Sequence, residues 1–203
     1  MKTVSLSGAP RAHVGKKDAK QNRKEGKIPC VIYGGKEQIH FTLPELTFNK
    51  ILFTPEVYII EIDIDGKTYK TILQDVQYHP VSDKVLHADF LEIIEGKKLI
   101  VALPVKFSGV APGVTKGGKL MVKYRKLRVK GEIDKMPEFI DVDISNLEIG
   151  QSVKVREINL DGLTVVDTPN AVVVQVKMAR GAKSALAQTE NEEGEGEEAP
   201  AAE

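Results

Sequence analysis

Two histidines and an aspartate near the middle of the chain are the residues whose types and spacing could do chemistry. His87 and Asp89 are two positions apart, so on a β-strand their side chains would point to the same face. Asp89 could then hold the ring of His87 in one orientation, either in a metal or general-base site with His79 or in a hydrogen-bonding pair. A hydrolytic metal site needs three or more ligands, and no further His or carboxylate falls at a suggestive spacing. We therefore favour the hydrogen-bonding pair.

A cysteine nucleophile is the other enzymatic hypothesis, and the sequence around it argues against it. Cys30 is the only cysteine and is followed by Val31 and Ile32, as expected for a small apolar side chain inside a buried strand. The chain has no paired Cys and His of a zinc site and no glycine-rich phosphate loop of the GxxxxGK[ST] type. We expect a protein that is not an enzyme, with no catalytic residue, no metal and no cofactor.

Charge is distributed unevenly along the chain, although Lys plus Arg and Asp plus Glu both number 29. The first 36 residues hold nine Lys and Arg against two acidic residues, whereas residues 181–203 hold seven Glu and one Lys. A basic arm at one end and an acidic tail at the other indicate a polyanionic partner, with RNA or DNA as the first candidate.

The basic arm predicts a short helix over residues 16–24, ended by Gly26 and Pro29. Four cations fall at positions i, i+4, i+7 and i+8 and so share one helical stripe: Lys16, Lys20, Arg23 and Lys24. Like charges at this spacing repel each other by a few tenths of a kcal/mol. Such a stripe makes most sense if an anionic partner covers it.

A second basic cluster runs from Lys116 to Lys130, and its strand pattern splits the charges over two faces. A solvated edge strand protected by lysines is one interpretation, and a subsidiary RNA contact is the other.

Short strands must position these residues in the first half of the chain. Alternating or apolar runs predict strands at residues 2–6, 30–33, 39–43, 58–64, 67–73, around 75, and 86–94. Asp65-Gly66 between two such runs predicts a tight hairpin. Thr42 and Glu45 fit a capping box opening a second short helix, with Phe48, Ile51 and Leu52 facing inward. A small, mostly antiparallel barrel is the simplest way for these strands to protect their edges.

The second half of the chain predicts strands only, at residues 99–107, 120–129, 140–144, 152–158 and 171–178. We therefore expect a mainly β protein with two short helices, divided into a barrel domain (1–95), an all-β domain (97–180) and a disordered acidic tail (181–203).

Composition adds little about location. No apolar run approaches the roughly 18 residues of a membrane span, and the N-terminus lacks the apolar core of a secretory signal. A basic N-terminus can also be an organellar transit peptide, but here Lys outnumbers Arg and the stretch runs directly into apparent structure. We expect a cytoplasmic protein without a membrane partner.

Three stretches of the first half resemble a known family: Gly15 to Gly35, Gln74-Asp75-Val76-Gln77-Tyr78-His79-Pro80 and His87-Ala88-Asp89-Phe90. Their order and spacing are those of the bacterial large-subunit ribosomal protein twenty-five family. The two-part length and the acidic tail resemble its longer members, called Ctc or general stress proteins.

The resemblance implies binding to 5S rRNA, at its internal loop, in the central protuberance of the large ribosomal subunit. Neighbouring ribosomal proteins or 23S rRNA would be partners of the second domain. The residues matching the RNA-contacting positions of the family are Arg11, Lys16, Lys20, Arg23, Tyr33, Gln74, Gln77, His87 and Asp89.

The basic segment departs from the commoner family pattern Gly-Lys-Gly-Ala-Ser-Arg-Arg-x-Arg at residues 17–21. Ala19 replaces a hydroxyl, Gln21 replaces a guanidinium, and Lys20 can neutralise a phosphate but cannot make a bidentate fork. The hypotheses left open are a ribosomal RNA-binding scaffold protein, which the resemblance favours, a free RNA-binding stress factor, and an enzyme.

Overall fold

The computed structural model describes residues 1–35, 37–94, 96–160 and 162–178, and it is mainly β. By spatial proximity the chain divides into two compact units. The first comprises Met1–Pro104, Arg128–Ile140 and Leu160–Val166; the second comprises Val105–Leu127, Asp141–Asn159 and the described residues from Asp167 onward. The domain boundaries expected from the sequence stay predictions, and the disorder expected for 181–203 lies outside the described residues.

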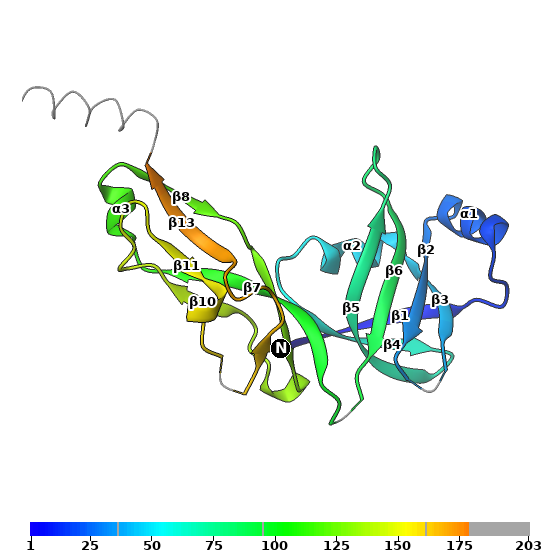
Figure 1. The fold of residues 1–203 in the computed structure, drawn as a ribbon. Coiled ribbons are helices and arrows are strands. Elements are labelled where there is room, and N and C mark those ends of the chain that lie inside the picture. Colours follow the sequence, from blue (N-terminus) through cyan, green and yellow to red (C-terminus); the bar gives the residue numbers. More distant parts are fainter. Residues whose placement is uncertain (36, 95, 161, 179–203) are drawn as a thin grey trace, which may run out of the picture. The chain divides into compact units, whose positions relative to one another are not determined.

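Six strands of the first unit form a closed barrel in the order β1-β3-β2-β6-β5-β4 (Figure 1). They are β1 (Lys2–Pro10), β2 (Lys27–Tyr33), β3 (Ile39–Pro44), β4 (Tyr58–Ile64), β5 (Lys67–Tyr78) and β6 (Val85–Glu92). The parallel pairing of β1 with β4 closes the barrel, and β2 and β6 form a second parallel pair. Closure leaves none of these six strands with an unpaired edge, which confirms the expected barrel.

The hairpin predicted at Asp65-Gly66 joins β4 to β5. Both residues have positive φ, 51° and 79°, as a type I′ turn requires, and the strands pair directly beside the turn from Ile64 to Lys67. Farther along, β5 departs from regular pairing with β6 between Leu73 and Asp75 and again between Gln77 and Tyr78.

Aromatic side chains fill the centre of the barrel. Phe41, Phe48 and Phe90 are fully buried, and the ring of Phe90 lies 5.6 Å from that of Phe41 and 6.0 Å from that of Phe48. Edge-to-face and tilted contacts of this kind add to the free energy gained from burial. Gly8 of β1 allows Phe41 this position, because a Cβ at residue 8 would lie 2.7 Å from Phe41 Cδ2.

The first helix, α1 (Lys16–Lys24), has the bounds that the sequence predicted and lies next to β2 (Figure 1). Gly26 follows it with φ of 72°, a conformation that favours glycine at a helix end. Pro29 lies inside β2 and not after it. Pro29 pairs in register with Thr42 of β3, and the pairing of β2 with β6 begins only at Cys30.

The second helix, α2 (Glu45–Leu52), buries Phe48 and packs Ile51 and Leu52 against the core, as expected. The capping box is wrong. Pro44 occupies the N-cap position without a side-chain hydrogen bond, and the Thr42 hydroxyl donates to Ala9 O at 3.4 Å instead. Thr42 is still part of β3, two residues too early to cap the helix.

The remaining elements form two open sheets. A four-stranded sheet has the order β10-β7-β9-β12 and a three-stranded sheet the order β11-β13-β8. The strands are β7 (Leu99–Ser108), β8 (Gly118–Val122), β9 (Lys126–Gly131), β10 (Ile140–Asp143), β11 (Ser152–Lys154), β12 (Thr164–Val165) and β13 (Val172–Met178). Three short helices accompany them: α3 (Pro112–Thr115), η1 (Ile133–Lys135) and η2 (Val155–Glu157). The run expected as one strand over 120–129 is divided between β8 and β9, so its two ends belong to different sheets.

Candidate nucleic-acid interface

The outer face of β2, β6 and β5 carries the polar residues singled out in the sequence. Along β6, Ala88 and Phe90 are fully buried, while His87 and Asp89 keep 28% and 30% of their side chains exposed. Gln77 of β5 lies directly opposite His87 in the strand register. Alternation along the strand thus separates a barrel-filling side from a polar outer side, as the sequence predicted for these residues.

His87 and Asp89 lie close together, with 2.7 Å between His87 Nδ1 and Asp89 Oδ1. The distance is that of an ion pair, yet the two atoms do not meet the directional geometry of a hydrogen bond, and both are buried without such a bond among the described residues. The proximity confirms that the two side chains share one face.

Tyr33 is the last residue of β2, and two carboxylates, those of Asp89 and Asp75, act on its hydroxyl. Burial is the main cause that raises the pKa of the Tyr33 phenol above its usual value, followed by the negative charges of Asp89 and Asp75. The hydroxyl therefore stays protonated at neutral pH and can donate as well as accept. Asp75 pairs directly across from Asp89, and two like charges in this register destabilise a sheet unless they find donors.

The two glutamines are presented by the irregular part of β5. Gln74 sits where the register shifts between Leu73 and Asp75, and both Gln74 and Gln77 are exposed. A bulge re-aims the side chain of its extra residue, so Gln74 need not follow the alternation of its neighbours.

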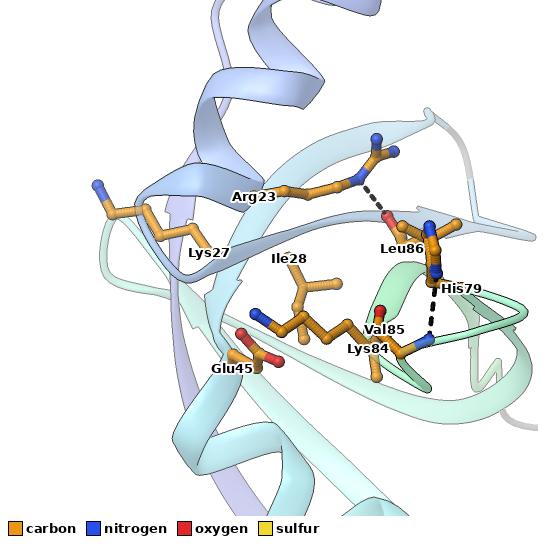
Figure 2. Close-up of a pocket in the computed structure, with 9 residues that line it drawn as sticks. Arg23, Lys27, Ile28, Glu45, His79, Lys84, Val85 and Leu86 are labelled. Atoms are coloured by element: carbon orange, nitrogen blue, oxygen red, sulfur yellow. Dashed lines mark hydrogen bonds between the residues drawn. The ribbon is translucent and has the colours of Figure 1, made fainter.

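The cations of α1 differ in what they contact. Lys16 and Lys20 are exposed and form no ion pair with the described residues. Arg23 donates from Nε to the carbonyl oxygen of Leu86 at 2.9 Å and extends from α1 to β6, as Figure 2 shows. Its two terminal nitrogens form no hydrogen bond or ion pair with other described residues, so they can meet an anionic partner. The bond places the basic helix beside the strand residue that precedes His87.

Arg11 is the exception among the predicted contacts. Its side chain is only 7% exposed, and its guanidinium binds the carboxylate of Asp18, with 2.8 Å between Arg11 Nε and Asp18 Oδ2. Arg11 therefore lies near α1 but does not present its charge to solvent.

A cavity of about 90 Å³ lies between the C-terminal end of α1 and the β5–β6 turn. Three cations line it: Arg23 of α1, Lys27 of β2 and Lys84 of the β5–β6 turn (Figure 2). Glu45 is the one acidic residue of the lining. His79 also lines it, and His79 Nδ1 accepts from the backbone N–H of Ser82 at 3.2 Å, so this ring stabilises the turn.

The described part of the chain contains no group of three or more His, Cys, Asp or Glu side chains arranged to hold a metal ion. Cys30 is fully buried, and burial raises the pKa of its thiol far above the usual value. No described helix has the length and apolar character needed to cross a membrane.

Comparison with family models agrees with this geometry. Residues 6–90, which span all but the ends of the barrel, match the model described as the ribosomal L25p family. Residues 98–180 match the model described as ribosomal protein TL5, C-terminal domain. The chain belongs to the ribosomal L25p family.

Relatives in this family align along nearly the whole chain. A protein of Porphyromonas gingivalis named large ribosomal subunit protein bL25 is 42% identical over 187 residues, which cover 91% of this chain and 97% of that protein. Proteins of the same name from Azobacteroides pseudotrichonymphae and Bacteroides thetaiotaomicron are 42% and 40% identical, covering 93% and 92% of this chain and 100% and 98% of their own lengths.

The L25p family resemblance did not indicate two acidic residues that the structure brings to the interface. Asp18 binds Arg11 across a loop, which no spacing rule anticipates. Asp75 lies opposite Asp89 through the pairing of β5 with β6, and the irregularity between Gln77 and Tyr78 in that pairing has no sequence signal from which the register could be counted.

The second basic cluster lies outside the residues matched to the L25p model. β8 is an edge strand and carries exposed Lys119, which fits the solvated-edge interpretation. β9 lies between β7 and β12, with Lys126, Arg128 and Lys130 on its exposed face and Leu127 buried. The edge interpretation therefore fails for β9, and the RNA contact stays a prediction.

Proposed function

We propose that this protein is a structural, non-catalytic component of the large ribosomal subunit that binds 5S rRNA at its internal loop, in the central protuberance. The interface consists of the exposed cations of α1 and the polar outer face of β2, β6 and β5. Membership of the L25p family and the names of its relatives support the ribosomal role, and a ribosome-associated cytoplasmic location follows from it.

One contact carries the proposal: the bond from Arg23 Nε to the carbonyl oxygen of Leu86. It fixes the basic helix beside His87, so a single RNA segment can meet the cations and the polar face together. The cations of α1 alone would bind any RNA, and the polar face of β2, β6 and β5 alone would lack the positive charge that attracts phosphates.

The two parts suit different features of folded RNA. Lys16 and Lys20 can neutralise phosphates, which supplies affinity without sequence information. The wide minor groove of paired RNA displays 2′-hydroxyls and base edges, which offer both donors and acceptors. Gln77 and Tyr33 can donate and accept, whereas Asp89 costs affinity beside RNA unless it accepts from a base or sugar donor. We assign recognition to these polar groups.

Binding measured against salt concentration tests this division. Lys16→Ala or Lys20→Ala should weaken binding to 5S rRNA and flatten the log–log salt dependence by roughly 0.7–0.9 for each lost phosphate contact. His87→Ala or Asp89→Asn should instead reduce the preference for 5S rRNA over an unrelated RNA of equal length, with the slope nearly unchanged. Equal changes of slope in all four variants would contradict the assignment.

The location of the interface is tested by fragments. We propose that residues 1–95 suffice for 5S rRNA binding, because all six barrel strands end by Glu92. A fragment of residues 97–203, which would meet 23S rRNA or neighbouring proteins instead, should show no preference for 5S rRNA. Specific binding by that fragment would overturn the domain assignment. Sedimentation of the full chain with the large subunit through moderate salt distinguishes a ribosomal protein from a free RNA-binding factor.

A further inference from the structure

Arg11 differs from the other cations near α1 in its surroundings. It follows β1 directly, and its backbone N–H donates to the carbonyl oxygen of His40 in β3 at 3.0 Å. Its side chain is 7% exposed, whereas Lys16 and Lys20 are exposed to solvent. The guanidinium is bound to a carboxylate and is largely shielded from solvent, so its positive charge is already compensated within the protein.

Those partners connect the barrel to the first turn of α1. Arg11 donates from Nε and from a terminal nitrogen to Asp18 Oδ2. The same carboxylate oxygen accepts from Asn22 Nδ2 at 3.0 Å, and Asn22 Nδ2 also lies 3.0 Å from the carbonyl oxygen of Asp18. The polar chain thus runs from β3 through Arg11 and Asp18 to the middle of the helix.

The helix needs such support. No residue of α1 is fully buried, so the helix has no apolar anchor in the core. Lys16 and Lys20 repel each other at i, i+4, and an isolated nine-residue helix is marginal in water. Arg23 ties the C-terminal end of α1 to Leu86 O, and Asp18 is the corresponding tie near the N-terminal end.

We propose that Arg11 and Asp18 form a positioning pair, which fixes the N-terminal end of α1 on the barrel and so presents Lys16 and Lys20 to RNA in a set geometry. Arg11 is then not itself a phosphate contact. The proposal rests on the proposed function, because it assigns a role within the same interface. Fixing the cations before binding lowers the cost of ordering them on RNA.

The sharpest test is whether replacement of Asp18 weakens or strengthens RNA binding. Asp18→Ala in the full chain removes a negative charge from a basic helix, yet it should weaken binding to 5S rRNA by about threefold or more, because the lysines lose their fixed geometry. Glu25→Ala is the matched control. It removes a negative charge just after the same helix without touching the pair, and it should strengthen binding. Stronger binding in both variants would overturn the proposal.

Salt dependence separates positioning from direct contact. Arg11→Ala should weaken 5S rRNA binding with an unchanged salt slope, whereas Lys16→Ala lowers the slope by roughly 0.7–0.9. The double variant Arg11→Ala/Asp18→Ala should bind no more weakly than the weaker single variant, because each change already breaks the pair. A lowered slope for Arg11→Ala, or additive losses in the double variant, would make Arg11 a phosphate contact.

Amide hydrogen exchange of the free protein tests the pair without RNA. Both single variants should accelerate exchange in residues 16–24 while exchange in the barrel strands stays unchanged. Unchanged exchange in α1 would overturn the proposal. If the unaltered protein did not bind 5S rRNA, the proposed function would fail, and faster exchange in the variants would still establish the pair.

Discussion

Arginines that look equivalent in the sequence contact different groups in the structure. Arg11 and Arg23 both fall at positions matched to RNA contacts, yet Arg11 donates from Nε and a terminal nitrogen to a carboxylate, whereas Arg23 donates from Nε to a backbone carbonyl. The family resemblance pointed to both residues, but the sequence could not reveal that Asp18 lies within reach of Arg11. A residue-level role therefore depends on which donors remain for a partner.

Cys30 shows the opposite case, in which the sequence was sufficient. An apolar run around a lone cysteine predicted a buried, unreactive thiol, and the side chain is fully buried. Because burial disfavours the thiolate, the pKa of Cys30 is raised in the folded protein, whereas an unfolded thiol ionises near pH 8.5.

We therefore expect the stability contributed by Cys30 to be constant below about pH 8.5 and to fall above it, since only the unfolded chain then releases the proton. By pH 9.5 the loss should be about 1.4 kcal/mol of the free energy of unfolding relative to neutral pH. Urea unfolding at pH 7 and 9.5 of the protein and of Cys30→Ala measures the difference, because other titrating groups are common to both. Parallel pH profiles of the two proteins would contradict it.

Elements of the barrel were predictable to the extent that local pattern determines them. Strict alternation and the Asp-Gly turn gave β4, the turn and the start of β5, and helix formers followed by glycine gave α1. The pairing of β1 with β4 was not predictable. The two strands are far apart in the sequence, and no local pattern determines which residues of β1 lie opposite which residues of β4. The prediction of a capping box failed because Thr42 belongs to β3, and its local sequence fits a strand as well as a helix cap.

The candidate site followed the same rule. Residues on one strand, such as His87 and Asp89, could be assigned to one face from their spacing. The neighbourhood of Tyr33 and Asp75 could not, because it requires the parallel pairing of β2 with β6 and the bulge in β5.

Packing between β1 and the barrel core gives a prediction at the level of elements. Gly8→Ala should destabilise the fold by about 1–3 kcal/mol, because the new Cβ would lie 2.7 Å from Phe41 Cδ2 and that ring is held against Phe90. Gly15→Ala is the matched control, since a Cβ there meets no atom within 4 Å, and it should change stability by no more than about 0.5 kcal/mol. Chemical unfolding measures both, and equal stability of the two variants would show that Phe41 can move aside.

For the molecule as a whole, net charge conceals the property that matters for binding. The chain has equal numbers of basic and acidic residues, yet removal of residues 181–203 would leave 28 Lys and Arg against 22 Asp and Glu. A covalently attached anionic segment repels RNA in general and competes weakly for cations. It therefore affects non-specific binding, which depends almost entirely on phosphate neutralisation, more than specific binding.

Truncation after Arg180 should accordingly raise affinity for an unrelated RNA at low salt more than affinity for 5S rRNA. Under the proposed function, the polar face of β2, β6 and β5 contributes recognition that the tail does not oppose, so the specific complex is expected to gain less. The difference should fade above about 0.15 M salt, where the Debye length falls to roughly 8 Å. Titration of the full and truncated proteins with both RNAs at two salt concentrations measures it. Loss of 5S rRNA binding on truncation would instead make the acidic tail part of the recognition surface, because charge repulsion alone can only weaken the binding of RNA.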